Sequence, residues 1–350
     1  MIQTKIYRPG LAIPENAGAL VHDGDGDGVG AAAIWLIGNP VEYLSITNRR
    51  KFDIALVQRV SDNFPAASLA GKKVAVFDLD AESNRQDLEK LADSGADIEF
   101  YDHHTRDASI LPVQAKVYFQ KDDRGNCTAT VAYEIAGKQG HLNSTSNRQK
   151  AIQLAILGLV NDGKGSAAEK FGSPDVDEET RKSLTKYGRA INFGSGSAML
   201  DSTGLLIGLD QSGLPVQFLR ESPEINGLVD YRQKTLDNLM ARAERRSFGD
   251  IKLYLLPHSS PDDKEIALGA YNDLVTSLMN NDPDHAHVMA LQTPDSKWRV
   301  AFRSAQGKAR IMGGLVSLHY KEEVVGRETA AGFSTDNEIN LNDLARYLGG

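Results

Sequence analysis

Short apolar runs that end in acidic residues or histidine recur through the first half of the sequence, and they limit the possible folds. GALVH at 18–22, KKVAVFDLD at 72–80 and ADIEFYDHH at 96–104 each have the apolar character of a buried strand. The segments 29–38 and 85–93, which follow the first two, carry the apolar spacing of helices. Strands that alternate with helices predict a mostly parallel sheet flanked by helices. We therefore expect an α/β fold.

The second half of the sequence changes its predicted secondary structure twice. Residues 128–200 are mostly helical in pattern, whereas Gly, Ser and Asp dominate residues 193–213 and predict a loop. A charged stretch at 228–246 then predicts a bridging helix whose end is solvated. After it, strand patterns return as a pair at 287–293 and 297–304. The pattern predicts a second, smaller α/β domain with a mixed sheet.

These changes divide the chain into three predicted parts. Residues 1–200 would form the larger α/β domain, residues 201–247 a connector with the bridging helix, and residues 248–350 the smaller domain. Globular domains average roughly 150 residues, so the length of the chain fits two domains.

Composition narrows the classes of function. The chain has 39 basic and 47 acidic residues, and this net charge of −8 disfavours a protein that coats extended duplex nucleic acid. The longest apolar stretch, 31–37, is far shorter than the roughly 18 residues of a membrane span. Cys127 is the single cysteine, which fits a reducing compartment. We expect a cytoplasmic protein without a membrane partner, and an exposed edge strand would permit a homodimer.

Carboxylates and histidines collect where the predicted strands end. The carboxyl ends of parallel strands share one edge of the sheet, where ligands bind in open α/β folds. Carboxylates gathered at one place repel one another unless a cation neutralises them. Mixed Asp and His ligands suit Mn²⁺, with Mg²⁺, Co²⁺, Zn²⁺ and iron as alternatives. We therefore expect two divalent metal ions among the residues His22, Asp23, Asp25, Asp27, Asp78, Asp102, His103, His104 and Asp162.

Other interpretations of the acidic loop at 23–28 stay open. Its sequence DGDGDG is similar to the start of a calcium loop, but the glutamate that closes such a loop would fall on Ile34. Gly26, Gly28 and Gly30 could form a dinucleotide-binding loop, although the aspartates there would repel a pyrophosphate. An acidic surface turn without a ligand is the simplest alternative.

Taken together, these motifs resemble the DHH phosphoesterase superfamily, named for the motif that stands here at 102–104. The acidic loop 23–28 is similar to the first motif of the family, in the form found in its RecJ branch. Asp78 is similar to the second motif and Asp162 to the fourth. The order and approximate spacing of the motifs agree over residues 17–165.

The last part of the chain resembles the DHH-associated substrate domain. An Arg-Ser pair follows a predicted strand, and a later glycine-rich loop has Arg327 where that domain has histidine. The fourth motif also differs, because Gly163 and Lys164 follow Asp162 where Thr-Gly is usual. The resemblance implies that substrate is bound by Arg303, Ser304, Gly326 and Arg327.

The resemblance also implies roles for the clustered residues. The metal ligands would be His22, Asp23, Asp25, Asp27, Asp78, His103 and Asp162. Asp78 would bridge the two ions. His104 would contact a phosphate or protonate the leaving oxygen, and Asp102 would orient a histidine.

The function that the resemblance implies is that of a two-metal phosphoesterase. It would hydrolyse phosphodiester or phosphomonoester bonds in short oligonucleotides or small nucleotides by activating water. One alternative is a phosphoanhydride hydrolase of the exopolyphosphatase or pyrophosphatase type. Another is a non-catalytic nucleotide-binding member of the family. In each case the expected partner is a small phosphorylated molecule or a short oligonucleotide.

Overall fold

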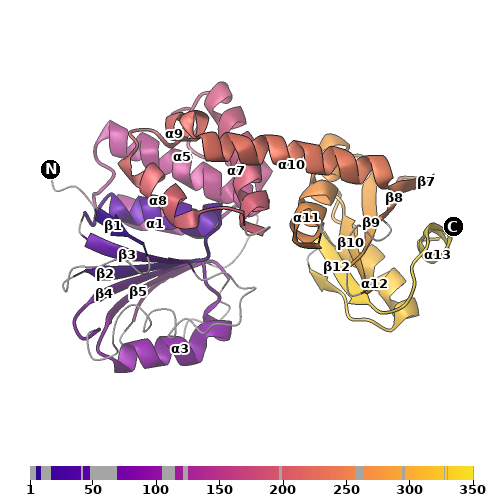
Figure 1. Ribbon diagram of the computed structural model, residues 1–350, viewed down its shortest axis with the longest axis horizontal. Coiled ribbons are helices and arrows are strands. Elements are labelled where there is room, and N and C mark those ends of the chain that lie inside the picture. Colours follow the sequence, from indigo (N-terminus) through magenta and orange to yellow (C-terminus); the bar gives the residue numbers. More distant parts are fainter. Residues whose placement is uncertain are drawn as a thin grey trace. The chain divides into compact units, whose positions relative to one another are not determined.

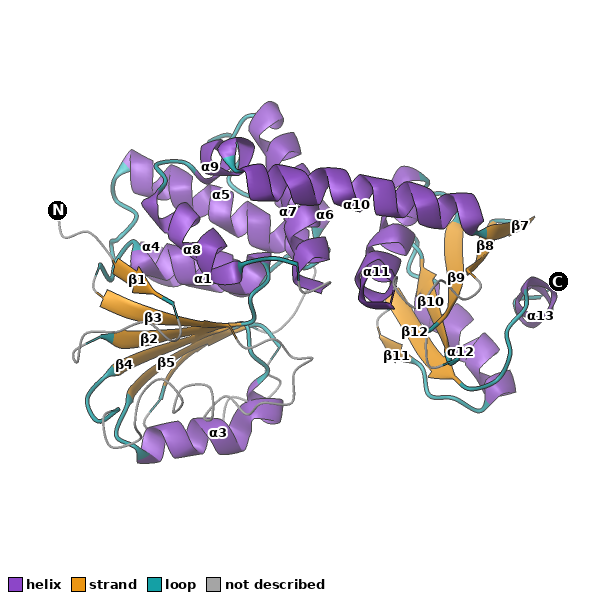
Figure 2. Ribbon diagram, in the orientation of Figure 1, coloured by secondary structure: helices purple, strands orange, loops and turns teal. Residues whose placement is uncertain are grey.

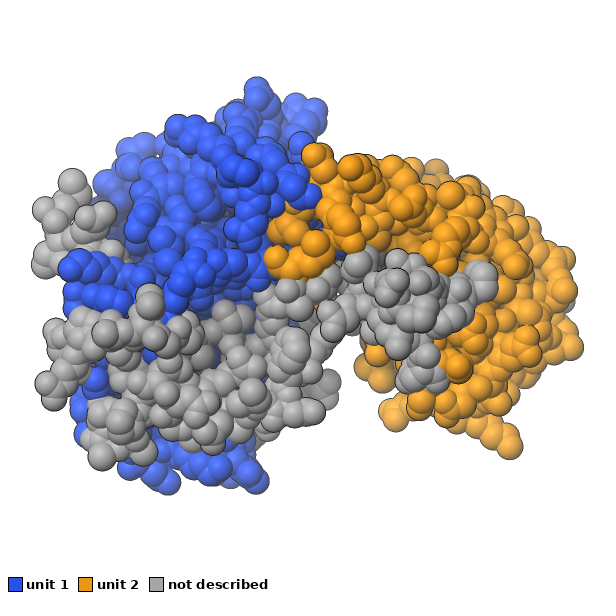
Figure 3. All heavy atoms as spheres, in the orientation of Figure 1, with its two compact units in different colours: residues 1–195, 200–227 blue, residues 196–199, 228–350 orange. Residues whose placement is uncertain are grey.

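The computed structural model of the chain contains two compact units, which Figure 3 shows in different colours. The first unit comprises residues 1–195 and 200–227, and the second comprises residues 196–199 and 228–350. The residues that the structure describes are 5–8, 17–40, 42–47, 69–104, 115–120, 125–196, 199–256, 264–293, 296–326, 328 and 330–349.

In its described residues, the first unit contains a sheet of six parallel strands (Figure 2). In chain order the strands are β1 (Lys5–Tyr7), β2 (Gly18–His22), β3 (Glu42–Thr47), β4 (Lys73–Phe77), β5 (Asp97–Asp102) and β6 (Lys116–Phe119). Their order across the sheet is β1-β3-β2-β4-β5-β6. The chain runs outward from β2 to β3 on one side and from β4 to β5 on the other. The strand order therefore reverses between β2 and β4, and this is where open α/β sheets bind ligands.

Helices cover both faces of this sheet (Figure 1). α3 (Ala81–Asp93) lies on one face, and α1 (Gly26–Leu36) lies on the other, packed against α4 (Thr128–Lys138) and α5 (Thr145–Asn161). Every residue of α1 is buried, and its many small residues allow the neighbouring helices to approach closely. The parallel α/β architecture predicted from the sequence is confirmed. None of the helices in the described part of the chain is both long enough and apolar enough to cross a bilayer.

One further helix of this unit lies where the sequence predicts a loop. After α6 (Gly165–Lys170) and α7 (Glu178–Gly196), residues Ser202–Gln211 form α8, which is followed by α9 (Pro215–Glu221). The Asp201 carboxylate caps α8 by accepting a hydrogen bond from the Gly204 N–H at 2.9 Å. The apolar side of α8 is buried through Leu205, Leu206 and Leu209. Such a cap contributes about 1 kcal/mol, and burial adds more, so together they outweigh the low helix propensity of glycine.

The second unit is built on a mixed sheet, as predicted. Its strands are β7 (Glu244–Phe248), β8 (Ile251–Leu256), β9 (Ala286–Gln292), β10 (Trp298–Arg303), β11 (Val325–Gly326) and β12 (Ala330–Thr335). They are ordered β11-β12-β10-β9-β8-β7, with β8 and β9 parallel and the other pairs antiparallel. The helices of this part of the chain are α10 (Pro223–Arg242), which begins in the first unit, α11 (Lys264–Asn281), α12 (Ala309–Tyr320) and α13 (Leu341–Tyr347).

The predicted bridging helix ends earlier than the sequence suggests. α10 stops at Arg242, and the charged residues that follow form the strand β7 instead of a solvated helix end. β7 pairs with β8 in antiparallel register, with Arg246 opposite Leu253. Because β7 is an exposed edge strand, it carries charged side chains, which is also the composition of a solvated helix.

Candidate metal centre

The carboxyl ends of β2, β4 and β5 bring the acidic and histidine motifs of the first unit together. Ligand atoms of Asp23, Asp25 and Asp78 all lie within 4.8 Å of one another, and we call these three residues the carboxylate group. Ligand atoms of Asp78, His103 and His104 satisfy the same limit, and we call these three the histidine group. The two groups share Asp78, and both lie at the reversal of strand order between β2 and β4.

Asp25 is held in place by backbone and side-chain donors. It is the N-cap of α1, and its Oδ1 accepts hydrogen bonds from the N–H groups of Asp27 at 2.9 Å and Gly28 at 3.0 Å. Its Oδ2 accepts a third bond from Nδ2 of Asn161 at 2.8 Å. Oδ1 of Asn161 in turn accepts from the Gly26 N–H at 3.0 Å. Asn161, the last residue of α5, therefore clamps the first turn of α1, although no local sequence pattern indicates this role.

Asp27 points at the first turn of another helix. Its two carboxylate oxygens accept hydrogen bonds from the N–H groups of Thr128 and Ala129, both at 2.8 Å. These donors begin α4, and a helix N-terminus stabilises negative charge. The Thr128 hydroxyl donates to Oδ1 of Asp78 at 2.9 Å. Thr128 therefore connects the two aspartates, and no motif in the sequence marked it.

Asp78 adopts a backbone conformation that is unusual for a residue with a side chain. It directly follows β4, and its φ angle is +60°. Its N–H still donates to the Tyr101 carbonyl at 3.0 Å, which continues the pairing of β4 with β5. Aspartate adopts this left-handed conformation more readily than most residues, although at some cost in free energy. This turn at Asp78 places its carboxylate close to Asp23 and Asp25 on one side and to His103 and His104 on the other.

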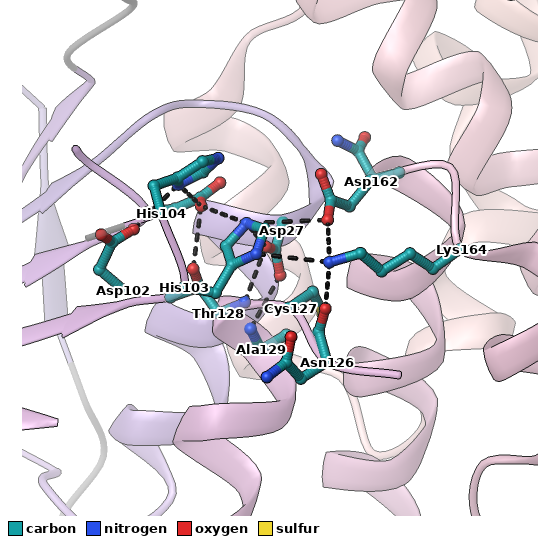
Figure 4. A network of polar contacts seen from close by, with 12 residues as sticks. Asp27, Asp102, His103, His104, Asn126, Cys127, Thr128, Ala129, Asp162 and Lys164 are labelled. Atoms are coloured by element: carbon teal, nitrogen blue, oxygen red, sulfur yellow. Dashed lines mark hydrogen bonds and ion pairs between the residues drawn. The ribbon is translucent and has the colours of Figure 1, made fainter. Parts of the chain in front are cut away.

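His103 is buried at the middle of the network in Figure 4. Its Nε2 lies 3.5 Å from Oδ1 of Asp78, 3.6 Å from Oδ2 of Asp27 and 3.7 Å from Oδ2 of Asp162. One imidazole nitrogen therefore faces three carboxylates that come from three separate segments of the chain.

His104 is the more accessible of the two histidines. Its side chain is 24% exposed, whereas that of His103 is fully buried. Nδ1 of His104 lies 2.9 Å from Oδ1 of the buried Asp102 and 3.4 Å from Oδ1 of Asp78. Asp102 therefore fixes the orientation of the His104 ring.

Asp162 and Lys164 are placed by the way in which α5 ends. Asp162 is the C-cap of the helix, and Gly163 follows with a φ angle of +73°, which glycine adopts without strain. The Gly163 N–H donates to the Val160 carbonyl at 3.1 Å, and the Lys164 N–H donates to the Leu159 carbonyl at 2.8 Å. These two bonds form a Schellman motif, which satisfies the last carbonyls of the helix. It turns both side chains toward His103.

The Lys164 side chain is buried within the network (Figure 4). Its Nζ lies 2.7 Å from Oδ2 of Asp162 and 3.4 Å from Nδ1 of His103, and it donates a hydrogen bond to the Asn126 carbonyl. The sequence shows Lys164 as a departure from the fourth DHH motif, but it does not show that the ammonium reaches the centre.

His22 lies at the end of β2, as predicted, but outside both ligand groups. The residue is buried, and its Nε2 lies 3.0 Å from the hydroxyl of Ser45. That hydroxyl lies 3.1 Å from Oγ1 of Thr203, so the chain of polar contacts leads toward α8.

Burial and mutual repulsion dominate the electrostatics of the centre. Burial raises the pKa of Asp25 to about 7, and the nearby Asp78 carboxylate adds to this effect. Burial, again reinforced by Asp78, raises the pKa of Asp27 well above its ordinary value. Burial lowers the pKa of His103, but the hydrogen bond to Asp78 and the surrounding carboxylates outweigh it and raise the pKa to about 9. The cluster therefore favours any added positive charge.

The donor set fits a divalent ion. Three carboxylates and two imidazoles offer hard oxygen and borderline nitrogen atoms, a mixture that suits Mn²⁺ and related ions. A calcium loop is not supported, because the acidic residues follow a strand and the loop leads directly into the buried helix α1.

The predicted substrate-binding residues belong to the second unit. The register pairs Arg303 of β10 with Ala330, and Gly326 of β11 with Ala331, so both lie at the same end of this sheet. Burial lowers the pKa of Arg303, whose Nε donates to Oγ1 of Thr276 at 3.2 Å. Ser304 directly follows β10 and is buried. The remaining predicted residue, Arg327, lies outside the described residues.

Comparisons with known proteins agree with this architecture. Residues 19–160 match the model of the DHH family, N-terminal domain. No curated protein matches the chain. One similar solved structure is described as the DHH domain of a member of a family of ribosomal proteins. It is 12% identical, with a TM-score of 0.60, and the match covers 95% of this chain and 86% of that one.

Another similar structure is that of RecJ from Thermus thermophilus in complex with Mn²⁺. It is 16% identical, with a TM-score of 0.57, and the match covers 96% of this chain but 52% of RecJ, so the present chain spans about half of RecJ. Likenesses at these identities show the fold, and the family match confirms the resemblance that the motifs suggest. Residues 19–160 of the first unit are therefore similar to the N-terminal domain of the DHH family, in sequence as well as in fold.

Proposed function

We propose that the protein is a divalent-metal-dependent phosphoesterase that acts on short oligonucleotides or small nucleotides. The observation that carries this proposal is the carboxylate group of Asp23, Asp25 and Asp78 at the reversal of strand order of a DHH domain. Mn²⁺ is the ion that the donor set favours, and the RecJ structure with Mn²⁺ supports the same choice.

The three residues of the carboxylate group would hold the ion. A divalent ion bound there acts as a Lewis acid on a phosphoryl oxygen and lowers the pKa of a bound water. The protein's own contribution is rigidity, because three hydrogen bonds fix the Asp25 carboxylate before any ligand arrives. Donors that are already in position lose no free energy to reorganisation when the ion or the substrate binds.

His104 is the proposed proton donor. Asp102 accepts a hydrogen bond from Nδ1 of His104, so the second ring nitrogen stays available to a bound phosphate. The partial exposure of His104 makes this nitrogen accessible, whereas His103 is buried. A histidine in this arrangement can protonate a leaving oxygen, with Asp102 as the residue that positions the ring.

The second unit would contribute contacts to the substrate. Arg303, Ser304, Gly326 and Arg327 are the proposed binding residues. An arginine can bind a phosphate through two parallel hydrogen bonds. The excess of acidic residues disfavours a long nucleic acid, which needs an extended basic surface, and this supports a small substrate.

The test is an assay of phosphodiester hydrolysis on EDTA-treated protein, with Mn²⁺, Mg²⁺, Co²⁺ and Zn²⁺ added separately. We expect activity that depends on the metal and that falls at least about a thousandfold in Asp78→Asn. Asp282→Asn is the matched control, because Asp282 is a charge-paired aspartate of the second unit, 2.8 Å from Nδ1 of His285. Equal activity of the wild type and Asp78→Asn would contradict the proposal.

A second assay separates the substrate classes. Release of mononucleotide from a dinucleotide is the expected result. Preferential release of orthophosphate from polyphosphate or pyrophosphate would instead identify a phosphoanhydride hydrolase. Binding of nucleotide without turnover under any of the four metals would identify a non-catalytic member of the family.

A further inference from the structure

The Lys164 ammonium is a fixed positive charge inside the proposed metal centre. The residue is 6% exposed, and its Nζ lies 2.7 Å from Oδ2 of Asp162. The Schellman turn at Gly163 and the hydrogen bond to the Asn126 carbonyl determine where this ammonium lies. Because the main chain on both sides is held, the side chain cannot leave without giving up contacts that are buried.

This ammonium competes with a metal ion for Asp162. A divalent ion lies about 2.1 Å from a carboxylate oxygen that ligates it. An ion on the Asp162 oxygen that contacts Lys164 would therefore lie less than about 5 Å from the ammonium. Charges of +1 and +2 at that separation, with little water between them, weaken the binding of the ion by about a thousandfold or more.

The position of His103 shows how close the ammonium is to the other carboxylates. Nδ1 of His103 lies 3.4 Å from Nζ of Lys164. Nε2 of the same ring lies 3.5 to 3.7 Å from carboxylate oxygens of Asp27, Asp78 and Asp162. A second ion bound among these carboxylates would therefore share Asp162 with the ammonium and be repelled by its charge.

We propose that the Lys164 ammonium takes the place of a second metal ion. On this view the centre holds a single divalent ion, at Asp23, Asp25 and Asp78, and not the pair that the family resemblance implies. The inference rests on the metal dependence in the proposed function. It assigns Lys164 the role of setting the number of ions, and it makes Asp162 the partner of an ammonium instead of a metal ligand.

The test measures how much Mn²⁺ the full chain binds. EDTA-treated protein is dialysed to equilibrium against Mn²⁺, and bound manganese is determined by elemental analysis. Low-temperature EPR spectroscopy then reports whether the bound ions are isolated or magnetically coupled. The wild type is expected to bind one Mn²⁺ per chain with the spectrum of an isolated ion. Lys164→Met, which removes the charge at similar length, should bind two, with the spectrum of a coupled pair.

Three variants make the result decisive. Lys164→Arg keeps the charge and should still bind one ion. Lys150→Met is the control, because Lys150 is a half-buried lysine of α5 whose Nζ donates to the Asp210 carbonyl at 2.6 Å. If Lys164→Met fails to fold, Lys164→Gln removes the charge while keeping a donor for Asn126.

The possible outcomes separate this inference from the proposed function. Two coupled ions in the wild type, or one ion in both neutral variants of Lys164, would overturn the inference and leave the metal-dependent function standing. A wild type that binds no Mn²⁺ would overturn the metal-dependent function itself.

Discussion

Replacing Asn161 with alanine should destabilise the first unit and lower its affinity for Mn²⁺. The side chain is buried and makes two bonds to the first turn of α1, at 2.8 Å to the Asp25 carboxylate and at 3.0 Å to the Gly26 N–H. The alanine variant leaves a buried N–H without its acceptor and a carboxylate without one donor. At roughly 1.5 kcal/mol for each loss, the free energy of unfolding should fall by about 3 kcal/mol.

The assay is urea or thermal unfolding of the EDTA-treated full chain, monitored by far-UV circular dichroism. For a unit of this size the expected loss corresponds to a decrease in Tm of about 6 to 12 °C. Because Asn161 also positions the Asp25 carboxylate, the Kd for Mn²⁺ should rise about 10- to 100-fold.

The matched control is Asn147→Ala on the same helix. Asn147 is part-buried, and its Nδ2 donates to the His141 carbonyl at 3.0 Å, so this variant loses one bond outside the centre. We expect a cost of about 1 kcal/mol and no change in the affinity for Mn²⁺. Equal stabilities of the two variants, with equal metal affinities, would refute the view that Asn161 clamps Asp25.

The centre supports three further predictions. Without metal, stability should fall as the pH rises from about 4 to about 7, because the folded state keeps a proton on Asp25 that the unfolded chain has released. Added Mn²⁺ should remove this decrease in Tm, and an unchanged slope would contradict it. Asp78→Ala should be about 1 kcal/mol less stable than Asp78→Asn, because asparagine tolerates a φ of +60° better; equal unfolding curves would argue against backbone strain there. His104→Gln should lower kcat by about 100- to 10,000-fold without loss of bound Mn²⁺, and a parallel loss of metal would instead make His104 a ligand.

The parallel sheet and the place of its acidic residues could be predicted from the sequence, because both depend on local patterns. A buried strand must be apolar, and a carboxylate directly after it is visible in KVAVFDLD. Sheet topology then brings distant strand ends to one edge, as Asp23 and Asp78 show. The sequence did not predict α8 and β7. The composition of each favours another structure, and packing against neighbouring elements decides the structure that forms.

The residues that hold the centre in place could not be predicted in the same way. Thr128 is the first residue of α4, directly after the N-cap Cys127, and nothing in its local sequence shows that its hydroxyl reaches Asp78. Asn161 ends an apolar helix, and its partner Asp25 lies far away in the sequence. Lys164 was visible as a departure from a motif, but its position depends on the Schellman turn and on the distance to His103. Such residues act through long-range contacts, which have no local pattern.

The residues of the proposed centre lie far apart in the sequence, and this has a consequence for biosynthesis. Asp23 and Asp25 emerge early from a translating ribosome, but Asn161, which clamps Asp25, emerges much later. A nascent polypeptide that ends before α5 lacks Asn161, so the hydrogen bond from Asn161 does not yet position its Asp25 carboxylate. At roughly 5 to 20 residues per second, several seconds of elongation separate the first ligand from its clamp. Under the proposed function we therefore expect Mn²⁺ to bind tightly only after α5 has been translated, when Asn161 can hold the Asp25 carboxylate in place.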